Sequence, residues 1–185
     1  MNNENEQDQL KAVFGSWIQA TGTVISAIGI STFFTIGTEI FNSLNLIGNV
    51  LQATGNAILA DAIRELSLDK IGNEIQAIGN STVISGILLD LDLQTKIKLD
   101  IDGNLLQALG GATSLAQALG SIPSAAVLYS IYGNSLQATG NSLQAYAGAK
   151  ALRNEDGENI NIVGSWIQAT GAVISAIGQT KYPYT

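Results

Sequence analysis

The stretch GSWIQATGTVISAIG, residues 15–29, returns near the other end of the chain as GSWIQATGAVISAIG, residues 164–178. The two copies differ only at Thr23 and Ala172. The first eight residues follow the pattern Gly-(Ser/Asn)-x-(Ile/Leu)-Gln-Ala-x-Gly, which recurs along the chain. Full copies begin at Gly15, Gly48, Gly72, Gly103, Gly133 and Gly164, and a partial copy begins at Gly140. Such repetition predicts a fold that reiterates one short supersecondary unit.

The spacing of the copies favours a helical unit. Successive full copies begin 33, 24, 31, 30 and 31 residues apart, which is the size of helical repeat units. Within a copy, Gly15, Gly22 and Gly29 recur every seven residues, or two turns of an α-helix, so they share one line of the helix. We call the glycine position a. Position d then holds Ile or Leu, c and g add apolar residues such as Trp17, Val24 and Ile28, f is Ala, and b and e are uncharged polar residues.

These positions predict an all-α, repeat-built bundle of close-packed apolar helices with glycine and alanine edges. Positions f, c, g and d form an apolar arc of about 160°, which implies burial on more than one side. Each Gly costs about 1 kcal/mol relative to Ala inside a helix, and close packing of backbones is the expected compensation. The Gln at position e has two open interpretations: a hydrogen bond across facing helices, or a stripe that faces solvent.

The alternative fold is a β-solenoid or cross-β repeat. Stretches such as VISAIGISTFFTIG, which begins at Val24, are rich in β-branched residues, and aligned Gln and Asn could stack as ladders. Residues 89–102 alternate apolar and polar side chains, so that segment could be helix or strand.

One domain is expected. We predict a disordered tail over 1–9, a single helical repeat domain over 10–180 and a short tail over 181–185. The expected helices cover about 9–29, 46–66, 70–89, 103–119, 123–153 and 159–179.

Composition excludes several classes of function. The net charge is −7, and the eight Lys and Arg residues form no basic stripe, so we expect no nucleic-acid partner. The chain contains no Cys and no His, which removes thiolate chemistry and the commonest general base. We expect no enzyme activity, no catalytic residues and no cofactor. The acidic N-terminus lacks the features of a secretory signal, so synthesis in the cytoplasm is expected.

The densest group of acids is Asp90, Asp92, Asp100 and Asp102. Calcium takes several oxygen ligands, but this spacing does not match an EF-hand loop. We therefore expect no metal site, and interpret these acids as a solvated face paired with Lys96 and Lys98.

A membrane-associated helical protein is the alternative function. Phe14–Thr38 and Gly103–Ala149 contain no charged residue, and both exceed the roughly 20 residues of a spanning helix. Against this, each heptad carries two polar side chains, and the flanks lack a basic bias or an aromatic belt.

The reiterated GNxLQAxGN, together with GSWIQATGTVISAIG, resembles the Gly-Asn-x-Leu-Gln-Ala repetitive protein family of Bacillus-type spore-forming bacteria. The similarity covers most of the chain beyond the first nine residues. It implies no activity and no catalytic residues, and it implies a structural role associated with sporulation or the spore.

The leading expectation is a self-assembling structural protein, as a homo-oligomer or a filament. Only 12% of the residues are charged, and a surface short of charge favours association; the near-identical chain ends suggest head-to-tail contact between copies. The expected self-association residues are Trp17, Ile18, Gln19, Gly22, Ile25, Gly29, Trp166, Ile167, Gln168, Gly171, Ile174 and Gly178.

Overall fold

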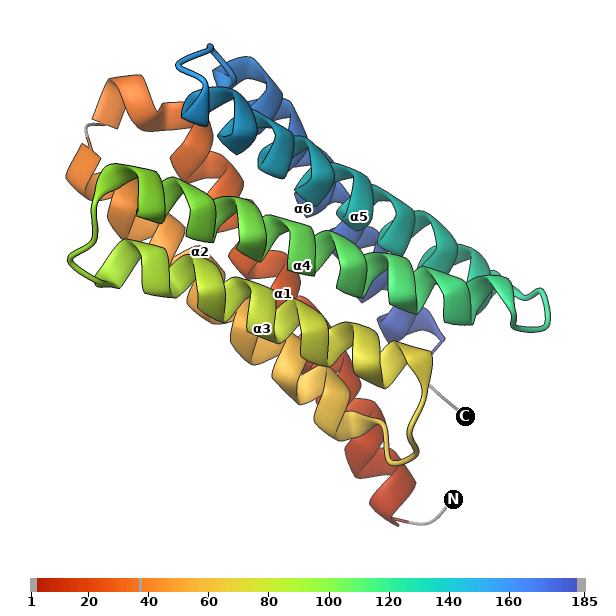
Figure 1. The fold of residues 1–185 in the computed structure, drawn as a ribbon. Coiled ribbons are helices and arrows are strands. Elements are labelled where there is room, and N and C mark those ends of the chain that lie inside the picture. Colours follow the sequence, from red (N-terminus) through yellow and green to blue (C-terminus); the bar gives the residue numbers. More distant parts are fainter. Residues whose placement is uncertain (1–2, 37, 183–185) are drawn as a thin grey trace.

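Each full copy of the repeat lies on a helix of its own. The computed structural model describes residues 3–36 and 38–182, and over those residues it contains six α-helices and no strand (Figure 1). They are α1 (Asn3–Ile36), α2 (Thr38–Ala62), α3 (Leu68–Leu88), α4 (Leu93–Leu119), α5 (Ala125–Leu152) and α6 (Glu158–Lys181). The predicted all-α fold is confirmed, and the β alternative is not.

Short polar side chains start several helices. Ser67 and Ser124 each accept a hydrogen bond from a backbone N–H in the first turn of α3 or α5. Asp92 accepts from both the backbone N–H and the hydroxyl of Thr95 at the start of α4. The undecided segment 89–102 is therefore a connection as far as Asp92 and helix beyond it, since the cap satisfies an otherwise unpaired backbone donor.

The expected N-terminal tail is helical where the structure describes it. Helix α1 begins at Asn3 rather than near residue 9, because Arg64 forms ion pairs with Glu4 and Asp8. This partner is remote in the sequence, so the local pattern gave no sign of it. Helix α6 ends at Lys181, and residues 1–2 and 183–185 of the expected tails lie outside the described residues.

The helices run up and down and close into a ring. Each helix packs against its neighbours in sequence, and α1 packs against α6. Both chain termini and the α2–α3 and α4–α5 connections lie at one end, which we call the terminal end (Figure 1). The α1–α2, α3–α4 and α5–α6 connections lie at the other, which we call the distal end.

Glycines hold the helices together in hairpins, α1 with α2, α3 with α4 and α5 with α6. A Cβ atom added at Gly22 would lie 2.6 Å from the carbonyl oxygen of Gly48 on the partner helix. At Gly140 it would lie 2.5 Å from the carbonyl oxygen of Gly164. These distances are shorter than any ordinary contact, so the predicted reason for the glycines, close approach of backbones, is confirmed.

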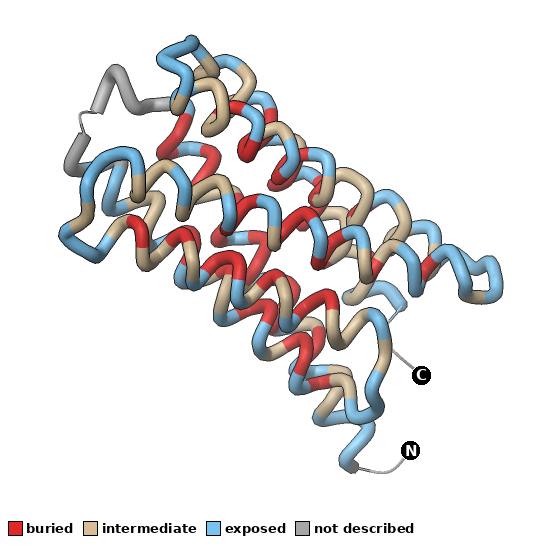
Figure 2. Tube along the Cα trace, viewed as in Figure 1, coloured by how far each residue is buried: buried red, intermediate tan, exposed pale blue. Residues whose placement is uncertain are grey.

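The arrangement of polar and apolar side chains is inverted relative to a water-soluble bundle. Figure 2 shows buried residues along the inner faces of the helices and exposed residues outside and at the ends. Gln137, Asn56 and Asn80 are among the largest fully buried side chains, whereas Phe14 is 62% and Leu109 is 55% exposed. We expected the apolar arc to be buried. Instead, the glycine contacts turn positions b and e toward the ring interior and leave the apolar c position outside.

Candidate functional site

The interior of the ring is built around the Gln of each repeat. On the odd-numbered helices, the Gln19 amide nitrogen donates to the side-chain oxygen of Gln137 at 2.8 Å and to that of Gln76 at 3.4 Å. These glutamines come from α1, α5 and α3, which are not neighbours in the ring, so their side chains meet across its centre. We call this group the odd triad.

A second group lies on the even-numbered helices. The Gln168 amide nitrogen donates to the side-chain oxygens of Gln52, at 2.8 Å, and Gln107, at 3.1 Å. We call these residues of α6, α2 and α4 the even triad. Gln144, one heptad after Gln137 on α5, donates to the Gln168 oxygen at 2.9 Å. Odd and even helices run in opposite directions, which places the two triads toward opposite ends.

Hydroxyl and Asn side chains complete the polar interior. Gln52 donates to the Ser26 hydroxyl and Gln137 to the Ser175 hydroxyl, both within a hairpin. The position-b residue Asn80 donates instead to the backbone carbonyl four residues earlier in its own helix, as does Asn104. Of the two interpretations left open for the Gln at position e, the hydrogen bond across helices is therefore the one observed.

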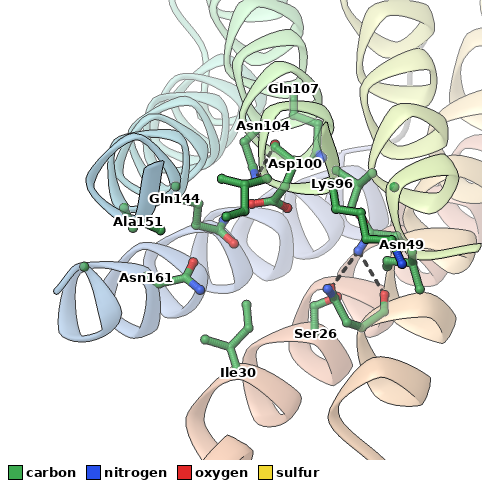
Figure 3. Close-up of a pocket in the computed structure, with 18 of the residues that line it drawn as sticks. Ser26, Ile30, Asn49, Lys96, Asp100, Asn104, Gln107, Gln144, Ala151 and Asn161 are labelled. Carbon is green, nitrogen blue, oxygen red and sulfur yellow. Dashed lines mark hydrogen bonds between the residues drawn. The ribbon is translucent and has the colours of Figure 1, made fainter. Parts of the chain in front are cut away.

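Two cavities flank the glutamines. The distal cavity has a volume of about 590 Å³ and is lined by Gln52, Gln107 and Gln168 of the even triad (Figure 3). The terminal cavity measures about 1060 Å³ and is lined by Gln19, Gln76 and Gln137 of the odd triad. The two cavities share no lining residue, so the triads form the partition between them.

Charged side chains also line both cavities. Lys96, Asp100 and Glu158 line the distal cavity, and Asp8, Arg64 and Lys181 are among those that line the terminal cavity. The part lined by the triads and their Ser and Asn neighbours is uncharged. Polar groups that both donate and accept therefore surround the centre of the interior.

Ion pairs lie outside this interior, one between two helices and one within the α5–α6 connection. Lys11 on α1 lies 2.8 Å from Asp61 on α2, and the hydrogen bond from Lys11 lowers the pKa of the Asp61 carboxyl. At the distal end, Arg153 and Glu155 are paired at 3.1 Å. Both pairs are exposed to solvent, where ion pairs contribute little to stability.

The acids singled out in the sequence have separate roles. Asp92 caps α4, and hydrogen bonds from Thr95 lower the pKa of its carboxyl. Asp100 lines the distal cavity. Among the described residues, the expected ion pairs with Lys96 and Lys98 are not formed, and no three acidic side chains gather where they could hold a metal ion.

The residues expected to mediate self-association contact other helices of the same chain. Gly22 and Gly29 pack against α2, and Gly171 and Gly178 pack against α5. Gln19 donates the bonds within the odd triad, and Gln168 donates those within the even triad. The isoleucines are half-buried; they are Ile18, Ile25, Ile167 and Ile174.

The tryptophans join the first helix to the last. The Trp17 indole N–H on α1 donates to the Thr180 hydroxyl on α6 at 2.9 Å. Reciprocally, the Trp166 indole N–H on α6 donates to the Ser31 hydroxyl on α1 at 2.8 Å. Ala20, Ala172 and Ala176 pack between the same helices. The near-identical ends of the sequence thus form one pseudosymmetric contact, the α1–α6 seam, within a single chain.

A family model matches residues 10–176, the part of the chain that carries the repeats. The chain belongs to the family of unknown function DUF6944. No curated protein and no solved structure matches it. Membership therefore assigns no activity, and the spore-associated role implied by resemblance stays a prediction.

Sequence reasoning missed the inverted arrangement of the site. The signal was present in the distribution of charge: every copy keeps uncharged residues at b and e, while Lys, Arg, Asp and Glu lie between copies, apart from Glu74 at position c of the third copy. A solvent-facing stripe of a soluble bundle would carry charges at those positions.

Proposed function

We propose that this protein is an integral membrane protein, in which the ring of helices spans the bilayer and encloses a polar interior. The observation that carries the proposal is the inversion of the fold: buried amides within an apolar outer wall. Polar residues in membrane-spanning bundles face the interior, whereas the residues in contact with lipid are apolar.

Several helices contain an uncharged stretch about as long as a bilayer is thick; in the α3–α4 hairpin the exposed residues Glu74 and Asp102 leave a shorter one. Each charged side chain that the structure describes lies in a connection or within about three turns of a helix end. At ~1.5 Å per residue, the uncharged residues 103–119 of α4 span about 25 Å, and 125–149 of α5 span about 37 Å. These lengths bracket the hydrocarbon core of a membrane, which is about 30 Å thick.

Hydroxyl groups on the outer wall are paired within their own helices. The exposed residues Thr54, Ser81, Ser142 and Thr170 each donate to the backbone carbonyl four residues earlier. Such pairing lets Ser and Thr face lipid without an unsatisfied polar group. These four hydroxyl groups are therefore compatible with a hydrocarbon environment.

Two described helical segments, Glu4–Ser31 and Glu158–Lys181, are long and apolar enough to cross a membrane by length and composition. The inward amides lower the average hydropathy of every helix in such a ring, although they do not touch lipid. Averages over a helix therefore understate the apolar character of the outer wall.

Self-assembly is the second candidate function, as the sequence predicted. The α1–α6 seam favours it, because α6 of one copy could replace α6 of another and form the same indole–hydroxyl bonds. In this case the apolar wall would be covered by further copies rather than by lipid.

A lysine in the outer wall tests the membrane proposal. Leu109 lies near the middle of the uncharged part of α4, and a Lys at the centre of a spanning helix costs about 2.5–3.5 kcal/mol of insertion free energy. The matched control is Ile122→Lys in the α4–α5 connection, where the side chain is 88% exposed at the terminal end.

The measurement is the fraction of protein that stays with membranes after carbonate extraction. We expect wild type and Ile122→Lys to stay, and Leu109→Lys to lose membrane association or accumulate poorly. Wild-type protein recovered without detergent as filaments would favour self-assembly. A soluble monomer would refute both candidates.

A further inference from the structure

We propose that the interior of the ring is a pathway for small uncharged polar molecules, such as water and urea, and that the two glutamine triads are its gate. This inference rests on the membrane proposal, because a pathway needs two compartments to join. It goes beyond that proposal by assigning an activity and a class of permeant.

The cavities are placed as the two halves of such a pathway. The distal cavity enters from the end that holds the α1–α2, α3–α4 and α5–α6 connections, and the terminal cavity enters from the opposite end. Residues of every helix line both cavities. Between them lie the triads, whose side chains cross the centre of the ring at hydrogen-bond distance. The described conformation is therefore closed at the glutamines and open on both sides.

The chemistry of the partition favours neutral permeants. Gln19 and Gln168 each present two bonds in which an amide N–H meets an amide oxygen. A molecule that both donates and accepts can replace such a bond with two of its own, so no group is left unpaired. A cation could bind the amide oxygens but would be repelled by the N–H groups beside them. An anion could bind the N–H groups but would be repelled by the oxygens. Charged selectivity rings of the kind found in ion channels are absent from this uncharged part of the described interior.

Polar atoms that face the terminal cavity could guide a permeant. Ser114 is 2% exposed and lines that cavity, and its hydroxyl oxygen has no hydrogen-bond partner among the described residues. The Gln179 amide nitrogen lines the same cavity and is likewise unpaired there. Buried polar groups are ordinarily paired, so these atoms are sites where water or urea can bind.

Permeation should depend on the length and polarity of the side chains at positions 19 and 168. In Gln19→Ala/Gln168→Ala, the donors of both triads are removed and the partition is widened. One net hydrogen bond changes an equilibrium about fivefold, so loss of the two bonds that each glutamine donates should raise the open population of each triad about 25-fold. In Gln19→Leu/Gln168→Leu, side chains of similar size close the centre with apolar groups, and permeation should fall below that of wild type.

The experiment uses purified full-length protein reconstituted into liposomes. Flotation of the liposomes first measures how much protein is inserted. Water efflux under a sucrose gradient and urea uptake are then followed by stopped-flow light scattering, and K⁺ flux is measured in parallel. Gln94→Ala serves as the control, because Gln94 is exposed near the start of α4 and lines neither cavity.

We expect water and urea permeability to be highest in the Ala variant, intermediate and equal in wild type and Gln94→Ala, and lowest in the Leu variant. K⁺ flux should be the same in all of them. Protein that does not float refutes the membrane proposal. If wild type and the Ala variant both float with the liposomes but are no more permeable than empty liposomes, the pathway is refuted and the membrane proposal is not. K⁺ flux that rises with water flux refutes the selectivity.

Circular dichroism shows whether the Ala variant keeps its helices. If it does not, Gln19→Asn/Gln168→Asn replaces it, since this change shortens both side chains but keeps the amides. Raised water permeability of the Asn variant supports the gate, and permeability equal to that of the Leu variant contradicts it.

Discussion

Gly110 and Gly111 are adjacent residues of α4 for which alanine should have opposite effects. A Cβ atom at Gly110 would lie 2.5 Å from the carbonyl oxygen of Gly72 and 2.6 Å from Cγ of Gln76, both on α3. At Gly111 the nearest atoms belong to Ala138 on α5, at 3.4 Å, which is ordinary contact. The pair therefore separates the cost of steric overlap from the intrinsic helix preference.

The magnitudes follow from these distances. Both substitutions gain about 1 kcal/mol from the higher helix propensity of Ala. Gly110→Ala must also move α3 and α4 apart by about 1 Å, and overpacking of this kind costs about 1–3 kcal/mol or more where the backbone cannot yield. We expect Gly111→Ala to stabilise by up to about 1 kcal/mol and Gly110→Ala to destabilise by about 1–2 kcal/mol.

Thermal unfolding followed by far-UV circular dichroism measures the difference. For a chain of this size, 1 kcal/mol shifts Tm by about 2–4 °C, so a difference of about 1–3 kcal/mol between the two variants corresponds to about 2–12 °C. Wild type should lie between them. Equal Tm values, or a more stable Gly110→Ala, would refute the conclusion that the glycines are required by the close approach of paired helices.

Two further predictions concern single interactions. Trp17→Phe and Trp166→Phe keep an aromatic ring but remove an indole donor at the α1–α6 seam, so each should lower stability by about 1 kcal/mol, or about 2–4 °C in Tm. Tyr132→Phe, at an exposed position on α5, is the control. Unchanged Tm values of the two tryptophan variants would show that the seam does not depend on these bonds. At Asp92, hydrogen bonds from the Thr95 hydroxyl and backbone N–H lower the pKa below 3.8 in the folded chain. Folding thus favours the carboxylate, so its contribution to stability is fully present above the unfolded pKa of 3.8 and is lost as pH falls through the lower folded value. The Tm advantage of wild type over Asp92→Ala should be constant near pH 6 and shrink below pH ~4; an advantage that grows in acid would contradict this assignment.

The helices and their contacts within hairpins could be predicted from the sequence because both follow from a local pattern. The seven-residue spacing of Gly15, Gly22 and Gly29 identifies a helix and the edge that packs closely. Similarly, the polar run after Leu152 marks the connection before α6. These features depend on residues that are close in sequence.

The interior could not be predicted in the same way, because two ways of packing the helices fit the same pattern of apolar and polar residues. A helix with an apolar arc and an amide stripe can bury either face, and the choice depends on the surrounding solvent. The bonds from Gln19 to Gln76 and Gln137 join residues 57 and 118 positions apart, and no local signal specifies such partners. The same holds for Arg64, whose ion pairs with Glu4 and Asp8 extend α1 to Asn3.

A single chain forms the whole circumference of the ring, which affects how the residues of its interior can evolve. In a pore made of identical subunits, a single substitution changes every wall position at once. Here each repeat mutates independently, so the circumference can become uneven. The positions one heptad from the central glutamines already differ, as Leu59, Val83, Ser114 and Gln144 show. Selection can therefore adjust the polarity of the interior one helix at a time, in steps that a symmetric assembly cannot make.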